Sequence, residues 1–436
     1  MSREYVYQQK DSVKGFVESS DGRAEEPVAV MDTPTVEKLV LCMALHGSSP
    51  YEGIRQTFIQ ALNYEISIGR ISSIIKRAAE KARIFDDQVD LSLITQGAND
   101  EIFQAQTPIL TGADPESTYI YLLEEAKDRK AETWETYMSD AKDKGLSLEV
   151  NISDQAKGLT AGVAAAFPDS EYQPDVFHVI SDIRKAITGI ERKAYAAIKR
   201  EYELKRYIDG KTARQKHKDE YEEQRPKTLD LIRLYDVLFI LFGWFRELLG
   251  FSGYNAADTK ELMEYVLEEF KNHAKDYPKL LKELDNVIRI LPSLLSFITR
   301  LEKTLEKESK QTGIPLEAFQ LMYREKSYEP YSGQSSNALY QIVLMLMGKY
   351  DYARERFENV LDSTKKASSI VENVNGRIRV YTDAKRNLKG GFFVLMKVFF
   401  NTEPYTRSRV KERKGKSPLE LLTGKPQPRF LEALGY

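Results

Sequence analysis

The chain has 436 residues, of which 42% are hydrophobic and 30% charged, and its formal net charge is −2. This composition is typical of a globular protein with two or three domains. The single cysteine, Cys42, excludes an internal disulfide and a zinc site built from cysteines. The most apolar run, Val237 to Phe245, is too short to span a bilayer. We therefore expect a cytoplasmic protein without a membrane partner.

Basic residues are concentrated in two segments, although the chain as a whole is nearly neutral. Residues 376–436 contain 14 Lys and Arg against 5 Asp and Glu, and residues 184–227 contain 14 against 8. DNA binding needs a basic patch on one face only, so the near-zero total charge does not exclude a DNA partner.

The N-terminal region predicts a flexible arm followed by short helices. Residues 1–33 are polar and lack hydrophobic periodicity, which favours an arm. Residues 34–88 predict three helices, and the third carries five basic residues on its outer face. Such a triplet is typical of a helix-turn-helix DNA reader, and the alternative is a helical cap or a dimerisation unit. The five basic residues are Arg70, Lys76, Arg77, Lys81 and Arg83.

Residues 89–180 predict a mixed α/β sheet. Three runs, DLSLITQGANDEIF, TPILTGAD and STYIYLLEE, have the composition of strands joined by short turns. A helix is expected at residues 131–144, then the strand LSLEVNIS, a helix at 154–167 and a short strand at 172–176. Three strands, helix, strand, helix, strand is an α/β pattern.

The rest of the chain predicts a helical block and a return to the sheet. Residues 181–365 carry helical periodicity without a strand signal, which predicts an all-α insertion. Residues 366–400 begin with an amphipathic helix whose apolar stripe, including Val374 and Ile378, suits packing against the sheet. We expect them to complete the catalytic core, with residues 401–436 as a basic, extended C-terminal tail.

Three acidic residues are candidates for a metal site. Asp100 lies within the first predicted strand, Asp154 lies where a later strand turns into a helix, and Glu372 lies on the helix after the block. Carboxylates that meet in one cleft repel one another unless a cation separates them. Mg²⁺ or Mn²⁺ prefers such oxygen ligands, and a pair of these ions supports phosphodiester chemistry.

The sequences around these residues resemble the three motifs of a DDE transposase of a bacterial insertion sequence, of Mutator-like and hAT-like breadth. They are NDEIF, ISDQAKGLTAGVAAAFPDSEYQPDVFHV and SSIVENVNGRIR. The resemblance implies a ribonuclease-H-like core interrupted by an α-helical insertion between Asp154 and Glu372, which 218 residues separate. It also implies that Asp100, Asp154 and Glu372 are catalytic and hold two metal ions. Asp175 and His178 match the Asp-x-x-His signature of such families and would support the site.

Other acidic residues remain alternatives for two of the three positions. Glu101 or Asp114 could take the first position, but Asp100 is preferred because it falls in mid-strand, whereas Asp114 begins a turn. Glu358 or Asp362 could take the third. Glu372 is preferred because Asn375 and Arg379 share its helical face.

Two further features are candidates for DNA contact. Trp244 could stack on a flipped base, as an insertion aromatic does in related transposases, although its apolar neighbours favour core packing. A basic strip near the C-terminus suits phosphate contact, with a solvated loop as the alternative. The strip consists of Arg407, Arg409, Lys411, Arg413, Lys414 and Lys416.

The resemblance implies a nucleoid-associated transposase that cleaves DNA at element ends and transfers strands by two-metal chemistry. Its partners would be double-stranded DNA, both the terminal repeats and the target, and further copies of the chain in a homo-oligomer on DNA. Three rival functions remain. They are a catalytically inactive, transposase-derived DNA-binding protein, a magnesium-dependent DNA nuclease without strand transfer, and a helical scaffold joined to an unrelated α/β domain.

Overall fold

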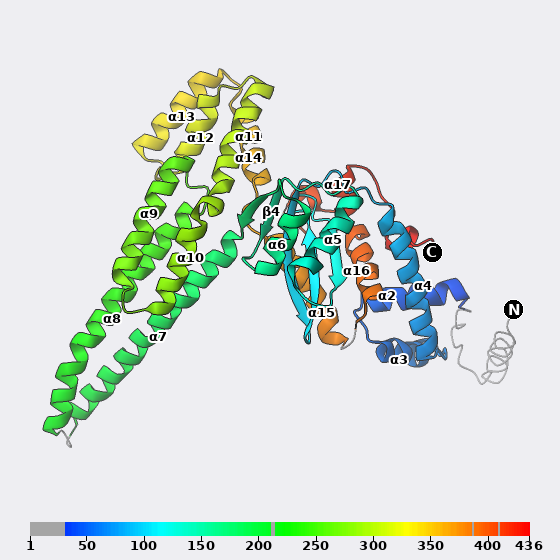
Figure 1. The fold of residues 1–436 in the computed structure, drawn as a ribbon, viewed down its shortest axis with the longest axis horizontal. Coiled ribbons are helices and arrows are strands. Elements are labelled where there is room, and N and C mark those ends of the chain that lie inside the picture. Colours follow the sequence, from blue (N-terminus) through cyan, green and yellow to red (C-terminus); the bar gives the residue numbers. More distant parts are fainter. Residues whose placement is uncertain (1–30, 211–213, 386–387, 409) are drawn as a thin grey trace, which may run out of the picture. The chain divides into compact units, whose positions relative to one another are not determined.

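The structure, a computed structural model, describes residues 31–210, 214–385, 388–408 and 410–436 (Figure 1). The arm predicted for residues 1–33 lies almost entirely outside the described residues. Arg409 of the basic strip also lies outside them. Contacts divide the chain into two compact units. The first unit comprises the described residues up to Gln88 together with Arg379–Thr402 and Pro428–Tyr436, and the second comprises Val89–Ile378 and Glu403–Gln427.

The first unit contains the three predicted N-terminal helices. The Asp32 side chain caps the first of them, and the Ser67 side chain caps the third. Val40 and Leu41 of the first helix and Ile71 and Ile74 of the third are fully or almost fully buried. The helices are α2 (Thr33–Leu45), α3 (Tyr51–Leu62) and α4 (Ile68–Asp87).

The apolar stretch near residue 395 completes this unit. It was expected to finish the catalytic core, but it forms helix α16 (Gly390–Thr402) and packs against α4 (Figure 1). Every residue of α16 from Phe392 onward is buried. A helix that is apolar on all sides needs partners all round. The short helix α18 (Phe430–Ala433) supplies part of that cover, because Phe430 packs edge-on against Phe399.

The second unit is built on a mixed five-stranded sheet in the order β3-β2-β1-β4-β5. Strand β2 runs antiparallel to both β1 and β3, and β4 and β5 run parallel to β1. The prediction of a mixed α/β sheet is therefore confirmed. The strands are β1 (Gln96–Gln104), β2 (Thr107–Ala113), β3 (Ile120–Glu125), β4 (Val150–Ser153) and β5 (Glu171–Pro174).

Two helices of the sheet unit, α5 (Ala131–Asp143) and α6 (Lys157–Ala166), pack closely against each other. The close approach depends on Gly162, where an added methyl group would overlap the Cβ of Trp134 and lie 2.5 Å from the Ala131 carbonyl oxygen. Helix α6 follows β4 after three residues, so this contact also fixes the chain just after the β4 end.

We expect Gly162→Ala to lower the free energy of unfolding by about 1–3 kcal/mol, because the methyl group meets backbone atoms that cannot move away. Urea unfolding followed by tryptophan fluorescence measures this, since both tryptophans lie in the second unit. Gly189→Ala is the matched control, because no atom lies within 4 Å of its added methyl group. It should raise stability by about 0.5–1 kcal/mol. Equal effects of the two variants would contradict the packing role of Gly162.

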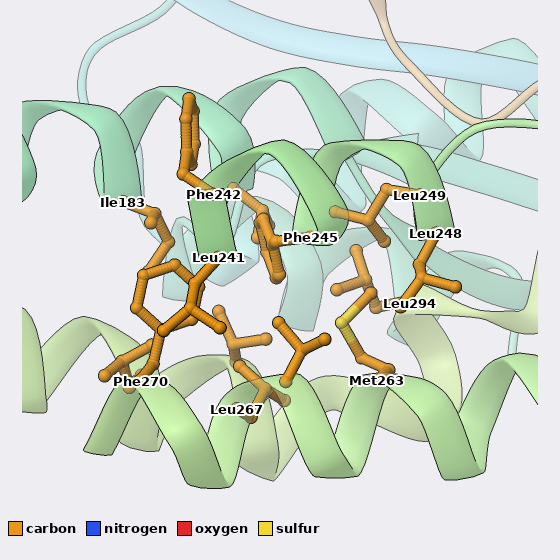
Figure 2. Close-up of a cluster of buried hydrophobic side chains, with 14 of the residues drawn as sticks. Ile183, Leu241, Phe242, Phe245, Leu248, Leu249, Met263, Leu267, Phe270 and Leu294 are labelled. Atoms are coloured by element: carbon orange, nitrogen blue, oxygen red, sulfur yellow. The ribbon is translucent and has the colours of Figure 1, made fainter. Parts of the chain in front are cut away.

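Helices α7 to α14 form a long helical block between β5 and the last part of the sheet unit. The block begins at Val176, five residues earlier than predicted, because the Asp175 side chain caps α7 directly after β5. Figure 2 shows the apolar core shared by α7, α8, α9 and α10, where Phe245 and Phe270 meet edge to face. The helices are α7 (Val176–Ile208), α8 (Gln215–Leu248), α9 (Ala256–His273), α10 (Pro278–Leu294), α11 (Ser296–Thr312), α12 (Leu316–Glu325), α13 (Gly333–Leu346) and α14 (Tyr350–Ser363).

Polar contacts anchor the block to the edge strand β5. The side chain of Gln173, fully buried, donates to the carbonyl of Leu294 at 3.2 Å and accepts from Ser296 at 3.0 Å. Arg300 on α11 donates to Glu171 and to Gln173. The junction between α10 and α11 is thus tied to the sheet.

The chain returns to the sheet through helix α15 (Ser369–Ala384), whose Val371, Val374 and Ile378 are buried. The segment after residue 402 was expected to be extended, but it folds back on itself. It contains the short helices η1 (Lys411–Arg413) and α17 (Pro418–Thr423) and a bridge between Tyr405 and Lys414. In the parts of the chain that the structure describes, no helix is both long and apolar enough to cross a membrane.

Candidate active site

The register of the parallel strands brings three aspartates into one row. Asn99 of β1 pairs with Ser153 of β4, and Ser153 pairs with Pro174 of β5. The residue after each of these is Asp100, Asp154 or Asp175. The three acidic residues therefore occupy equivalent positions at the carboxyl end of β4 and β5, which is the edge where α/β sheets bind ligands.

Asp100 is the most enclosed of the predicted triad, with only 9% of its surface exposed. One carboxylate oxygen accepts from the amide of Asn375 at 2.7 Å, and the other accepts from the backbone N–H of Glu101 at 2.8 Å. Burial, together with the charges of Asp154 and Glu372, raises the pKa of Asp100 to about 6. Asp100 therefore lies close enough to Asp154 and Glu372 for their negative charges to affect its protonation.

Asp154 lies one residue beyond β4 and is half-buried. Its carboxylate accepts from the backbone N–H of Ala156 at 2.9 Å, and its carbonyl accepts from the hydroxyl of Tyr172 at 2.9 Å. It lines a pocket of about 210 Å³ together with Asp175, His178 and Asp182. The Asp154 side chain is therefore held by local hydrogen bonds at the edge of an open cavity.

Asp175 and His178 form a hydrogen-bonded pair on the first turn of α7. The His178 Nδ1 lies 2.8 Å from the Asp175 carboxylate, which also accepts from the backbone N–H of Phe177 and from the hydroxyl of Ser368. Burial alone would raise the pKa of Asp175, but these hydrogen bonds hold it below its usual range. The hydrogen bond that the His178 ring donates to the Asp175 carboxylate raises the pKa of His178 to about 9, so its imidazole is positively charged at neutral pH.

Glu372 on the first turn of α15 completes the cluster. Its carboxylate lies 3.4 Å from the Nε2 of His178, and 35% of its side chain is exposed. Three residues on, Asn375 reaches Asp100, so one face of α15 contacts both α7 and β1. Asp154 and Glu372 lie 218 positions apart, and the chain between them is thus closed into a loop whose ends meet beside the sheet.

The donor set of this cluster suits a hard divalent cation, because it consists of carboxylate oxygens. As the side chains lie, no three acidic, histidine or cysteine groups among the described residues are close enough together to ligate one ion. His178 supplies a positive charge among the carboxylates. Ligation of a shared ion would therefore need movements that bring the carboxylates closer together.

The alternative acidic residues have other partners or lie elsewhere. Glu101 is paired with Arg129 at 2.7 Å. Asp114 accepts from the backbone N–H groups of Glu116 and Ser117 and so stabilises the turn after β2. Glu358 and Asp362 are exposed on α14. None of the four is among the charges that act on Asp100, so within the described residues the cluster contains the preferred candidates.

Four residues of the site were not predicted from the sequence as functional candidates. Asp182 lines the pocket, Ser368 donates to Asp175, and Arg129 lies close enough to Asp154 for its charge to be felt. Asn375 was noted only for sharing a face with Glu372, yet it binds Asp100. Asp182 could have been found from its spacing, because it lies one helical turn after His178. The other three depend on tertiary packing.

The two candidate DNA contacts differ from expectation. Core packing was favoured for Trp244, but 49% of this side chain is exposed, whereas the neighbouring Phe242 and Phe245 are buried. In the basic strip, Arg407, Lys411, Lys414 and Lys416 are exposed. Arg413 is partly buried and donates to the carbonyls of Pro115 and Glu116, so it anchors the strip to the turn between β2 and β3.

The model of a DDE transposase family, described as transposase, matches residues 109–301. Over this segment, which is less than half of the chain, the protein is similar to that family. The segment includes Asp154, Asp175 and His178, whereas Asp100 and Glu372 lie outside it. No match was found among curated proteins. The similarity supports a DDE transposase of an insertion sequence with DNA as its partner, and the Mutator-like and hAT-like breadth stays a prediction.

Proposed function

We propose that the chain is a transposase that cleaves DNA at the ends of a mobile element and joins the freed 3′ ends to target DNA. The observation that supports this most is that the charges of Asp154 and Glu372, which lie on either side of a helical block, both act on the buried Asp100. Strand order and directions agree with a ribonuclease-H-like core that carries the block as an insertion. We assign these three residues as the catalytic triad.

Asp100, Asp154 and Glu372 would hold two divalent ions, Mg²⁺ or Mn²⁺. The charges of Asp154 and Glu372 act on the buried Asp100 carboxylate, and a bound cation would relieve this repulsion. When bound, two such ions activate an attacking water or 3′-hydroxyl and stabilise the leaving oxygen of a phosphodiester. Both cleavage and joining can use the same site, since each step replaces one oxygen on phosphorus by another.

The remaining residues of the cluster would position this triad. Asp175 holds His178 through Nδ1, and His178 in turn faces Glu372 through Nε2. Asn375 holds one oxygen of Asp100, and the backbone N–H of Glu101 holds the other. We assign His178 a positioning role, because a group held by two carboxylates is poorly placed to accept a proton from water.

An assay with candidate terminal DNA of the element tests this function. Purified protein, labelled duplex and Mg²⁺ should give nicked products first and joined products later, and EDTA should suppress both. Hydrolysis without joined products would favour the nuclease alternative. DNA binding without any cleavage, in Mg²⁺ and in Mn²⁺, would favour the inactive DNA-binding alternative.

The basic strip is proposed to contact DNA phosphates outside the catalytic site. Replacing Arg407, Lys411, Lys414 and Lys416 by Gln should weaken binding to all sequences equally. It should also reduce the log–log slope of affinity against salt by ~0.9 for each lost phosphate contact. Arg413→Gln is the comparison, because its guanidinium is engaged by protein carbonyls. A salt slope that is unchanged in the fourfold variant would contradict phosphate contact by the strip.

The helices of the first unit are proposed as a second DNA contact, in the manner of a helix-turn-helix reader. Lys76 and Arg83 on α4 are exposed, whereas Arg77 pairs with Glu37 on α2 at 2.5 Å. Exposed cations on a helix supported by two others suit a groove of the duplex. A transposase also has to hold two element ends, so we expect a homo-oligomer on DNA.

A further inference from the structure

One face of α7 carries a regular row of cations and tyrosines. Four basic residues follow one another at intervals of seven, and Thr188, Tyr195 and Tyr202 repeat at the same interval between them. Seven residues are close to two helical turns, so the row runs straight along the helix. Tyr195 and Tyr202 are 65% and 62% exposed. The basic residues, all exposed, are Lys185, Arg192, Lys199 and Arg206.

The row lies on the side of α7 that faces away from the other helices. Ile183, Ile190 and Ala194 are buried on the opposite side, where α7 packs against α8 and α10 (Figure 1). Acidic residues of α7 offset only part of the charge of the row: Glu203 lies one helical turn from both Lys199 and Arg206, but no ion pair within 4.0 Å joins it to either among the described residues. Glu191 is half-buried and accepts from Tyr235 of α8, and Asp182 pairs with Lys185 at the inner end.

Arg192, Lys199 and Arg206 have no acidic partner within ion-pair distance among the residues that the structure describes. Two of the basic residues beside them in the sequence contact residues outside α7. Lys193 lies over the ring of Tyr277 at 4.9 Å, and Arg200 pairs with Glu220 at 2.9 Å. Arg192, Lys199 and Arg206 therefore present unpaired charge on the outward row, whereas Arg200 is paired on another face of the helix.

A polyanion fits this row better than another protein helix does. Four cations at intervals of about 10 Å would repel a second copy of α7. They suit the phosphates of a duplex, to which tyrosine hydroxyls also donate. From Lys185 to Arg206 the row is about 32 Å long at 1.5 Å per residue, close to one turn of B-form DNA.

We propose that this row is a DNA-binding track that leads from the catalytic cluster along α7. That DNA is the partner rests on the proposed function. The direction of the track along α7 is inferred from the position of His178. His178 lies on the first turn of the same helix and faces Glu372, so α7 begins in the cluster and carries the row outward. A duplex bound at the cluster would be held on the track over about one turn.

A pair of matched triple variants tests the track. Arg192→Gln, Lys199→Gln and Arg206→Gln together remove three charges from the row. Lys193→Gln, Arg200→Gln and Lys205→Gln together remove three charges from the adjoining positions of the same helix. The probe is a 40-base-pair duplex of random sequence, and affinity for the full-length protein is measured against salt in EDTA, so that cleavage plays no part.

The row variant should lower the log–log salt slope by ~2.7, at ~0.9 for each phosphate contact, and the adjoining variant should leave the slope nearly unchanged. Hydroxyl-radical protection should also be lost over about one turn of the duplex. In a second variant, Tyr195→Phe with Tyr202→Phe, loss of two hydrogen bonds should weaken binding by roughly 3- to 10-fold without changing the slope.

Two outcomes would overturn the track. One is an equal fall in slope for both triple variants, which would indicate a diffuse effect of net charge. The other is an unchanged slope with an altered sedimentation coefficient, which would assign the row to a protein contact. A row variant that loses affinity while the wild-type protein cleaves no DNA would support the track and count against the catalytic proposal alone.

Discussion

Asp154→Asn should abolish DNA cleavage and leave DNA affinity nearly unchanged. The side chain accepts a hydrogen bond from the backbone N–H of Ala156 through one oxygen, and an asparagine carbonyl oxygen can keep that bond. The substitution therefore preserves the local fold and removes only the negative charge that a metal ligand needs. Loss of transition-state stabilisation by about 4 kcal/mol or more corresponds to a fall of about 10³-fold in the cleavage rate.

The measurement is single-turnover cleavage of labelled terminal DNA in Mg²⁺, alongside an affinity measurement in EDTA. Asp169→Asn is the matched control, because it makes the same chemical change at an exposed position on the turn before β5. It should cleave at the wild-type rate. Cleavage by Asp154→Asn at close to the wild-type rate would remove Asp154 from the catalytic site and weaken the whole triad.

The sheet and its first two site residues could be predicted from the sequence because they depend on local signals. Asp100 falls within a run that has the composition of a strand, and Asp154 lies where a later strand turns into a helix. Parallel pairing then brings the two residues together, since Asn99 pairs with Ser153. The spacing of Asp175 and His178 at i and i+3 on one helix likewise fixes their contact in advance.

The position of α16 could not be predicted from the sequence. Its apolar composition demands burial but does not specify against which surface, and proximity to Glu372 suggested the sheet. Helix α16 instead packs against α4, where Lys397 forms an ion pair with Asp86. The prediction that Trp244 packs in the core was wrong for a related reason. An apolar run on a helix does not reveal which face of the helix is covered. Burial of Phe242 and Phe245 left Trp244 on the outer side of α8.

Lys397→Met should destabilise the first unit by about 3–5 kcal/mol. The Lys397 ammonium lies 2.9 Å from the Asp86 carboxylate, and both side chains are more than nine-tenths buried. Removal of the lysine leaves a buried carboxylate without its counter-charge, which costs far more than the ion pair itself contributes. Because both tryptophans lie in the second unit, the measurement is amide hydrogen exchange in α4 and α16, which reports the opening of the first unit directly.

Two further variants separate the cost of an unpaired charge from the loss of a contact. In Asp86→Asn with Lys397→Met, both charges are gone and the amide keeps hydrogen-bonding capacity, so most of the lost stability should return. Arg55→Met removes one partner of an exposed ion pair with Glu52 in the same unit and should leave exchange in α4 and α16 unchanged. If the double variant were as unstable as Lys397→Met alone, the effect would come from lost packing of the lysine stem. The buried charge would then not be what ties α16 to α4.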